Sequence, residues 1–268
     1  MTHLDTIDTA SSTLVRPDFF TWHNGERATL PFSRAEYDRR LAGLRAIMAE
    51  RDIEAALITS MHGVAYYSGF LYCAFGRPYA CVVTQDRSVT VSANIDAGQP
   101  WRRSADENVV YTDWQRDNYF RAVQKLIKDG QTVGIEFDHV SLQIMEKLKI
   151  ALPEARFVDI AETTRRLRML KYDEEIANIT KMTAIADLGG AACVEAIGVG
   201  VGEHEVALHT TQAMVREIGR VWPDGELLDT WTWFQSGLNT DGAHNPVTAR
   251  KIESGDILSM NCFPVVAG

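Results

Sequence analysis

The alternation of short strand-like runs with helical stretches is the feature that most constrains the fold of this chain. Residues 119–128 and 142–152 have helical character, and Pro153 ends the second stretch. Apolar runs of strand length lie around them, at residues 53–60, 80–84, 89–93, 109–111, 132–137 and 157–160. Residues 85–88 join two of these runs as a hairpin turn. Strands that alternate with helices predict an α/β domain, which we assign to residues 1–165.

The first firm element of this domain is a helix that begins at Ser33. Ser33 and Glu36 have the spacing of a capping box, in which each side chain satisfies a backbone N–H at the helix start. The residues expected on its buried face recur at three- and four-residue steps: Tyr37, Leu41, Leu44 and Met48. The residues before Arg27 show no periodicity. We expect them to form an arm that docks on the rest of the chain.

A second domain, residues 166–268, is expected to begin with two helices. The basic stretch 163–171 is interpreted as a linker, or as a helix that leads across it. Acidic residues 173–175 then suit the N-terminal dipole of a helix over residues 173–197. Its expected buried stripe is Ile176, Ile179, Thr183, Ala186, Gly190, Cys193 and Ile197. The adjacent glycines 189 and 190 predict the close approach of another backbone, because glycine otherwise costs a helix about 1 kcal/mol.

The rest of this domain is predicted to contain one more helix and two strands. The helix covers residues 203–220 and ends before Pro223. It carries one broad apolar face: Val206, Thr210, Met214 and Ile218. Residues 227–234 and 256–266 have strand character, and the chain is still apolar at Gly268. We therefore expect an incomplete domain in a truncated chain.

Composition and cysteine spacing exclude several classes of protein. The net charge is −9, from 27 basic and 36 acidic residues, which disfavours nucleic acid or an anionic membrane as a partner. No apolar run approaches the roughly 20 residues that span a bilayer, and residues 1–15 lack the apolar core of a secretory signal. The cysteines lack a Cys-x-x-Cys pair: Cys73, Cys81, Cys193 and Cys262. A cytoplasmic protein with reduced thiols is predicted.

Three patterns resemble catalytic or nucleotide-binding motifs but lack their geometry. The glycine-rich residues 198–202 follow a helix, whereas a dinucleotide-binding loop follows a strand. His204 and His209 are five positions apart, about 140° around a helix axis, so they cannot share one metal ion. Ser236 is not in a nucleophile elbow, because the glycine required two residues before it is absent. None of these patterns supports a function.

Residues 229–248 are different, because they combine aromatic, polar and glycine residues between two expected strands. The segment contains Trp231, Trp233 and His244, together with two aspartates and two asparagines. An aromatic strand followed by a polar turn can line a pocket. Spacing alone leaves two roles open for His244: a catalytic imidazole, or a turn residue that caps backbone groups.

Several long segments of the chain resemble the creatinase (creatine amidinohydrolase) family nearly residue for residue. They are residues 70–78, 96–103, 111–118, 229–237, 239–248 and 255–264, and the resemblance runs from about Trp22 to the end. It implies a homodimer of two-domain subunits, each with a smaller N-terminal α/β domain and a catalytic domain of the pita-bread (α+β) fold, shared with prolidase and methionine aminopeptidase. It also implies hydrolysis of creatine to sarcosine and urea without a cofactor.

The resemblance assigns roles to three residues. His244 would act first as general base and then as general acid, which suits an imidazole with an ordinary pKa of about 6.5. Phe75 and Arg77 would contact the substrate from the neighbouring subunit, and a guanidinium fork is suited to the carboxylate of creatine. The glutamates that hold the guanidinium, and a further arginine, would lie beyond Gly268.

Metal dependence divides the members of this fold, and Asn261 bears on it. Pita-bread metallopeptidases hold two ions with carboxylates and one histidine, and the position of the first of these aspartates corresponds here to Asn261. A neutral amide cannot replace that carboxylate without loss of charge balance, so a metal-free enzyme is predicted. The alternatives are a prolidase-like metallopeptidase and a non-catalytic pita-bread module that binds a partner.

Overall fold

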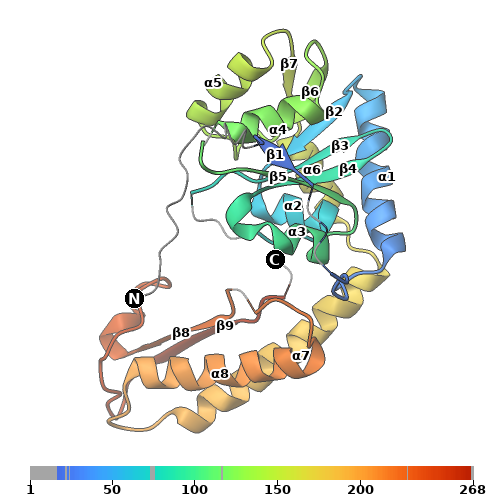
Figure 1. The fold of residues 1–268 in the computed structure, drawn as a ribbon. Coiled ribbons are helices and arrows are strands. Elements are labelled where there is room, and N and C mark those ends of the chain that lie inside the picture. The colour runs from blue at the N-terminus through green and yellow to red at the C-terminus, as the bar shows by residue number, and fades with distance from the viewer. Residues whose placement is uncertain are drawn as a thin grey trace, which may run out of the picture.

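The chain folds around two separate β-sheets (Figure 1), as seen in a computed structural model that describes residues 17–21, 23, 25–72, 76–115, 117–227 and 229–266. The larger, seven-stranded sheet has the order β1-β5-β4-β3-β2-β6-β7. Its strands are β1 (Phe19–Phe20), β2 (Ala55–Ile58), β3 (Ala80–Thr84), β4 (Ser88–Ala93), β5 (Glu107–Tyr111), β6 (Thr132–Ile135) and β7 (Arg156–Asp159). The pairs β2–β6, β6–β7 and β4–β5 are parallel, whereas β3 runs antiparallel to both of its neighbours.

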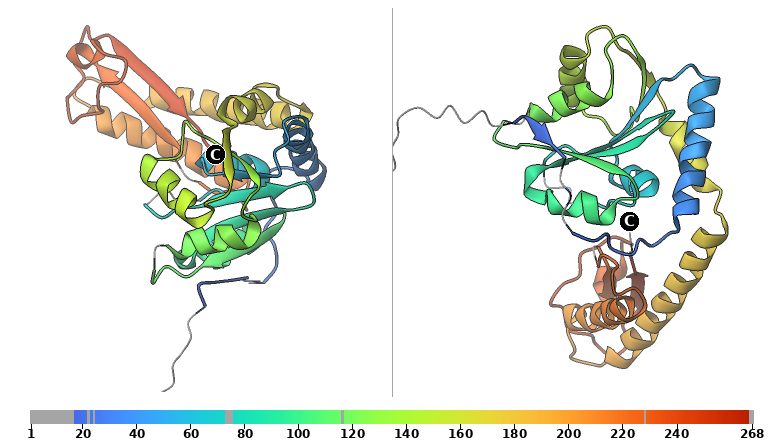
Figure 2. Two further views of the ribbon diagram at one scale, coloured as in Figure 1. Left: turned by 90° about the horizontal axis from the view of Figure 1, so that it is seen from above. Right: turned by 45° about the vertical axis from the view of Figure 1, so that its right-hand side comes forward.

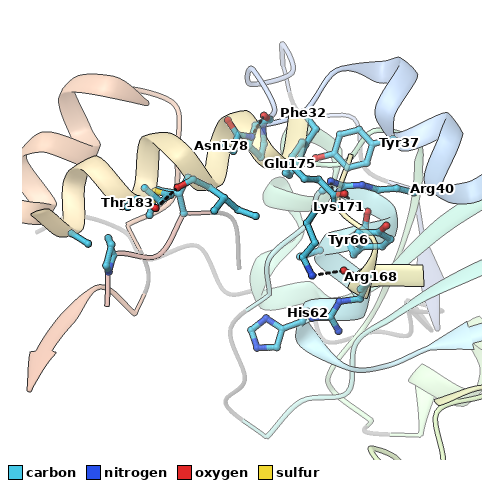
Figure 3. Close-up of a pocket in the computed structure, with 18 residues that line it drawn as sticks. Phe32, Tyr37, Arg40, His62, Tyr66, Arg168, Lys171, Glu175, Asn178 and Thr183 are labelled. Atoms are coloured by element: carbon cyan, nitrogen blue, oxygen red, sulfur yellow. Dashed lines mark hydrogen bonds and ion pairs between the residues drawn. The ribbon is translucent and has the colours of Figure 1, made fainter. Parts of the chain in front are cut away.

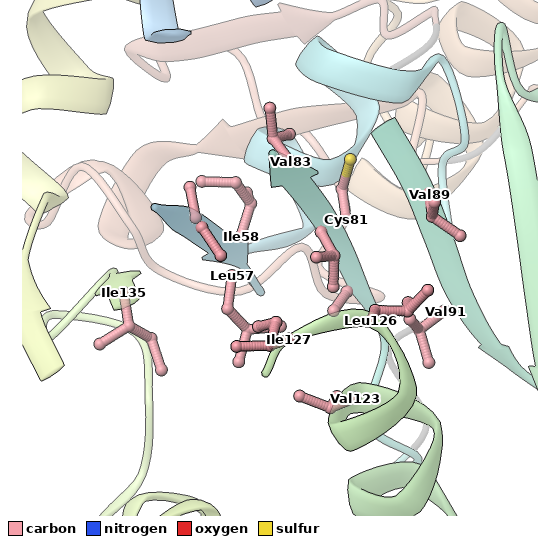
Figure 4. Packing of buried hydrophobic residues seen from close by; sticks show 14 of the residues in the cluster. Leu57, Ile58, Cys81, Val83, Val89, Val91, Val123, Leu126, Ile127 and Ile135 are labelled. Carbon is pink, nitrogen blue, oxygen red and sulfur yellow. The ribbon is translucent and has the colours of Figure 1, made fainter. Parts of the chain in front are cut away.

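Helices cover both faces of this sheet, so β2 and β4 are buried along their whole length. The helices are α1 (Arg34–Glu50), α2 (Met61–Ser68), α3 (Gly98–Arg103), α4 (Asn118–Leu126), α5 (Leu142–Ala151) and α6 (Ala161–Met169), with a 3-10 turn η1 (Asn94–Asp96). Figure 4 shows Val123 and Leu126 of α4 packed near Val91 of the central strands. The core of this α/β unit is therefore continuous from the sheet into the helices on each side.

The predicted hairpin, strands and helices of this unit are confirmed, with bounds shifted by a few residues. β3 and β4 pair antiparallel across residues 85–87, and α5 ends before Pro153. Part of the N-terminal arm docks as predicted, because β1 pairs with β5 at the sheet edge. The basic stretch 163–171 is largely helical, in α6, so the predicted boundary between residues 165 and 166 falls within a helix.

The capping box at Ser33 is only half formed. Ser33 Oγ accepts a hydrogen bond from the Glu36 N–H at 3.2 Å, as predicted. The Glu36 carboxylate turns instead to Arg39 and Arg40, and Glu174 accepts from the Ser33 N–H at 2.9 Å. Glu174, from the second part of the chain, therefore accepts the Ser33 backbone hydrogen bond that the capping box assigns to Glu36 of α1.

The second part of the chain consists of two helices packed against a two-stranded sheet. The helices are α7 (Asp173–Ala196) and α8 (Glu203–Val221), and the strands are β8 (Trp231–Ser236) and β9 (Leu258–Phe263), with a 3-10 turn η2 (Gly237–Thr240) after β8. The left-hand view in Figure 2 shows this hairpin extending away from the larger sheet, with α8 alongside it. With its helices and two sheets, the chain is a mixed α/β structure. None of the helices in the described ranges is long and apolar enough to cross a membrane.

The predicted buried face of α8 is confirmed, whereas that of α7 is partly wrong. Val206, Thr210, Met214 and Ile218 are all fully buried. On α7, Cys193 is buried as predicted, but Ile176 and Ile179 are half exposed, and the buried positions include Ile185, Gly189 and Ala192. The reason is that α8 and β9 pack on a face of α7 rotated from the expected one.

Gly189 is needed for close packing, although side chains rather than a backbone approach it. A Cβ atom at Gly189 would lie 2.7 Å from Met214 Sδ and 3.3 Å from Cys262 Sγ. The prediction that another backbone approaches the glycine pair is therefore wrong at Gly189. The glycine instead lets α7 and α8 come together over the thioether of Met214.

A buried ion-pair cluster joins the two parts of the chain. Arg40 of α1 donates to Glu36 at 2.7 Å, to the Tyr66 carbonyl at 3.0 Å and to Glu175 of α7 at 3.1 Å. Its guanidinium also lies 4.0 Å from the ring centroid of Phe32. Since Arg40 is only 3% exposed, these contacts hold the start of α7 against the α/β unit without competition from water.

Candidate functional site

The two faces of β8 have different roles, because side chains alternate along a strand. Thr232, Phe234 and Ser236 face α7 and α8, and Phe234 is fully buried. The register pairs Trp231 with Phe263 and Trp233 with Asn261, which places these four side chains on the opposite face. We call this the aromatic face, defined by Trp231, Trp233, Asn261 and Phe263.

Ring contacts run across the aromatic face. Trp231 stacks on Phe263 with centroids 4.5 Å apart and planes 17° from parallel. The rings of Trp231 and Trp233 lie 4.9 Å apart. Trp231 remains 40% exposed, so the face is accessible in the part of the chain that the structure describes.

His244 lies on this face, because the loop between β8 and β9 folds back over it. Its imidazole stacks on Trp233 with ring centroids 5.0 Å apart and planes 19° from parallel. The residue is exposed, and within the described ranges no hydrogen bond or ion pair occupies either ring nitrogen. Within the described ranges, the imidazole therefore caps no backbone group.

Gln235 holds the part of the loop on either side of His244. The Gln235 side chain is buried, and its Nε2 donates to the Asn245 carbonyl at 2.5 Å and more weakly to the Gly242 carbonyl at 3.4 Å. Asn245 Nδ2 in turn donates to the Asn239 carbonyl at 3.1 Å and to Asp241 at 2.5 Å. These hydrogen bonds hold the loop against β8 on both sides of His244.

Asn261 occupies the aromatic face opposite Trp233. Among the residues that the structure describes, no three His, Cys, Asp or Glu side chains gather in a way that could hold a metal ion. Asp256 also lies near this loop, but its carboxylate pairs with Arg250 at 2.5 Å. That the protein works without a metal ion remains a prediction.

Of the two predicted substrate residues of the α/β unit, the structure describes only Arg77, which lines a different cavity from the loop that carries His244. Phe75 falls outside the described residues. Arg77 is exposed, and its Nε lies 3.1 Å from Asp113. It lines a cavity of about 230 Å³ together with Tyr79 and His139, and this cavity contains no residue of the β8–β9 loop. One chain therefore does not unite Arg77 with His244.

A separate cavity of about 380 Å³ lies between the two parts of the chain. Figure 3 shows Arg40, His62, Tyr66 and Glu175 around it. Lys171 also lines it, with Nζ donating to the Arg168 carbonyl at 2.6 Å. No residue of the segment 229–248 contributes to its walls, so it is distinct from the aromatic face.

One residue that shapes the site could not be recognised from the sequence. Glu203 is fully buried at the start of α8 and accepts hydrogen bonds from three residues on both sides of the His244 loop: Ser236, Asn239 and Thr248. These partners are 33 to 45 positions away along the chain. An acidic residue at a helix start has an ordinary explanation in the helix dipole, so its position in the sequence suggested nothing more.

Comparison with known proteins finds similarity to creatinases and prolidases. Residues 40–170 match the family described as Creatinase/Prolidase N-terminal domain. A creatinase from a Bacillus species is 55% identical over 250 residues, which cover 92% of this chain and 61% of that protein. The chain thus spans about three fifths of the length of this relative.

Solved structures agree with the fold. An X-Pro aminopeptidase from Thermotoga maritima aligns with a TM-score of 0.71 at 20% identity, covering 85% of this chain and 61% of its own. A prolidase from Pyrococcus horikoshii aligns with a TM-score of 0.66 at 24% identity, covering 82% of this chain and 59% of its own. At such identities these two matches bear on the fold alone. The sequence relative, rather than these structures, shows that the chain is a homologue of creatinase over 92% of its length.

Proposed function

We propose that this protein hydrolyses creatine to sarcosine and urea, and that residues 166–268 form part of a pita-bread catalytic domain. The observation that carries the proposal is the exposed His244 imidazole, stacked 5.0 Å from Trp233 on the aromatic face. Sequence similarity also supports the proposal, because the chain is 55% identical to a creatinase. A planar guanidinium suits a site of this kind, because delocalised cations interact favourably with aromatic faces.

The chemistry requires a group that takes up a proton and then returns it. One ring nitrogen of His244 would remove a proton from water, and the resulting hydroxide would add to the guanidinium carbon. The imidazolium would then donate that proton to the N-methyl nitrogen as its bond to carbon breaks. Sarcosine leaves as a free amine, and the remaining protonated urea gives its hydroxyl proton to solvent, from which the sarcosine amine is protonated. A positioned acid–base of this kind contributes about 10²–10⁴-fold in rate.

The site is proposed to be shared between two subunits. His244 and Arg77 lie in different parts of one chain, and Arg77 makes a partly exposed ion pair with Asp113. Such a pair contributes little, roughly 0–1 kcal/mol, and can be exchanged for a substrate carboxylate. We therefore propose that Arg77 and Phe75 of one subunit bind the substrate beside His244 of the other.

We also propose that no metal ion takes part in the reaction. This rests on Asn261, whose neutral amide lies on the aromatic face where a metallopeptidase would need a carboxylate. Hydrolysis of Xaa-Pro dipeptides dependent on added Mn²⁺, with Mn bound in stoichiometric amount, would favour the metallopeptidase alternative. Creatine binding without turnover would favour a non-catalytic module.

The test is urea release from creatine by the complete gene product, measured with a coupled ammonia assay. We expect turnover that survives dialysis against a chelator. His244→Ala and His244→Asn should each lose at least about 100-fold in kcat, because the general acid–base is removed. Absence of urea release above that of the His244→Ala variant would refute the proposal. Mixing an Arg77→Ala chain with a His244→Ala chain tests sharing, since only hybrid dimers would recover one intact site.

A further inference from the structure

The loop that carries His244 has its two ends close together at the start of α8. The loop leaves β8 after Ser236 and returns to α8 at Thr248. There the Glu203 N–H donates to the Arg250 carbonyl at 3.0 Å, and the His204 N–H donates to the Thr248 carbonyl at 3.1 Å. The first turn of α8 is therefore bound to the returning end of the loop.

The carboxylate of Glu203 joins both ends of the loop at once. Its Oε1 accepts from the Ser236 N–H at 2.7 Å and from Ser236 Oγ at 2.8 Å. Its Oε2 accepts from the Thr248 N–H at 3.0 Å and from Thr248 Oγ1 at 2.6 Å. Asn239 Nδ2 donates to both oxygens at 3.0 Å. Every partner is a donor, so the site is built for an anion.

The surroundings keep Glu203 ionised although it is fully buried. Burial alone raises the pKa of a carboxyl group, but hydrogen bonds from Thr248, Ser236 and Asn239 outweigh it, and the pKa of Glu203 is lowered. Its place as the first residue of α8 adds the favourable end of the helix dipole. Hydrogen bonds to an ionised acceptor are about twice as strong as neutral ones.

An ion pair stabilises the end of the loop that leaves β8 after Ser236. Arg250 Nη1 donates to Ser236 Oγ at 2.7 Å and to Asp256 at 2.5 Å. Gly237, at φ +49°, passes directly beside this pair, and a Cβ atom there would lie 2.6 Å from Arg250 Nη2. The hydroxyl of Ser236 thus links Arg250 to Glu203 across the base of the loop.

We propose that Glu203 is the positioning residue for His244: its buried carboxylate closes the loop at both ends and thereby holds the imidazole on Trp233. His244 itself has no hydrogen bond within the described ranges that could do so. Glu203 does not touch the aromatic face, so it acts only through the loop. The effect of Glu203 on turnover rests on the proposed function, whereas its effect on the position of His244 does not.

The structural consequence can be measured by NMR. Stacking on Trp233 shifts the His244 Hε1 resonance upfield through the indole ring current, and the His244→Ala spectrum identifies this resonance among the seven histidines. Trp233→Phe should reduce the shift, which confirms its origin. Glu203→Gln retains the size of the side chain but places an NH₂ group among donors. We expect it to lose more than half of the upfield shift.

A matched control separates positioning from general loss of stability. Met214→Ala removes a fully buried side chain from the same helix without touching the loop. It should leave the His244 resonance in its wild-type position. A Glu203→Gln resonance at the wild-type position, or an equal displacement in Met214→Ala, would overturn the proposal.

The kinetic arm asks whether the position of His244 matters for turnover. With creatine, Glu203→Gln should lower kcat at least tenfold while KM changes less than twofold, because substrate contacts remain. If Glu203→Gln displaces the His244 resonance but leaves kcat unchanged, the proposed effect of Glu203 on turnover is wrong. Absence of creatine hydrolysis in the wild-type protein would refute the proposed function, and the NMR result would still decide the role of Glu203.

Discussion

Arg40 provides the sharpest test of what holds the two parts of the chain together. It lies between Glu36 of α1 and Glu175 of α7, at 2.7 Å and 3.1 Å, and all three residues are buried. Replacing Arg40 with methionine keeps most of its length but leaves two carboxylates without their shared cation. Breaking a buried pair in this way costs about 3–5 kcal/mol. The neighbouring Arg39 is the natural comparison.

Arg39 contacts the same carboxylates from the surface. It lies 2.6 Å from Glu36 and 3.8 Å from Glu175, but its side chain is 31% exposed. Arg39→Met should therefore cost only about 1 kcal/mol or less. Adding Glu175→Gln to Arg40→Met should recover part of the loss, because one of the stranded charges is removed.

The measurement is urea unfolding followed by circular dichroism and tryptophan fluorescence. With a slope near 3 kcal/mol per molar, the Arg40→Met midpoint should fall by roughly 1–2 M urea. Equal losses for Arg39→Met and Arg40→Met, or a loss below about 1 kcal/mol for Arg40→Met, would refute the reasoning. The buried cluster would then not be what secures α7.

Three further outcomes are expected. Gly237→Ala should lower the unfolding midpoint and weaken the His244 ring-current shift, because its Cβ would collide with Arg250 and the residue would keep φ +49°. Gly189→Ala should destabilise the protein by about 1–3 kcal/mol through overpacking on Met214, and Met214→Ala in the same chain should offset part of that loss. Glu203 has a lowered pKa, so its stabilising effect is complete above its ordinary value of 4.5 and is lost as the pH falls through the folded-state pKa. Between pH 5 and 3, stability should therefore fall less steeply in Glu203→Gln than in wild type, and parallel curves would contradict this.

The sequence predicted elements well where one periodicity governed burial. On α8 every fourth residue from Val206 to Ile218 is buried, and polar residues such as His209, Gln212 and Arg216 keep other sides of the helix at the surface. α7 is rich in small and apolar residues on several sides, so its sequence does not specify one face. Packing against α8 and β9 decides which face is buried: it covers Ile185 and Ala192, while Ile179 remains half exposed.

The candidate site was predictable only in part. His244 could be singled out because the residues around it are unusual and resemble a family. Glu203 could not, because its meaning depends on Ser236 and Thr248, which the fold brings to it from distant positions. The same limit applies at Ser33, where the expected partner Glu36 was replaced by Glu174 from another helix. Long-range polar contacts leave no periodic trace in a sequence.

The alternation along β8 has a consequence for how such a protein can change. Substitutions at Phe234 are constrained by volume, since the fully buried ring packs with Val206 and Cys193. Substitutions at Trp231 meet no such restriction on volume, because that side chain points away from the helices and is 40% exposed. On this short strand, the inner position Phe234 is therefore limited by volume, whereas the outer position Trp231 is open to substitution. Libraries that vary only Trp231 should give altered ligand preference in proteins that still fold.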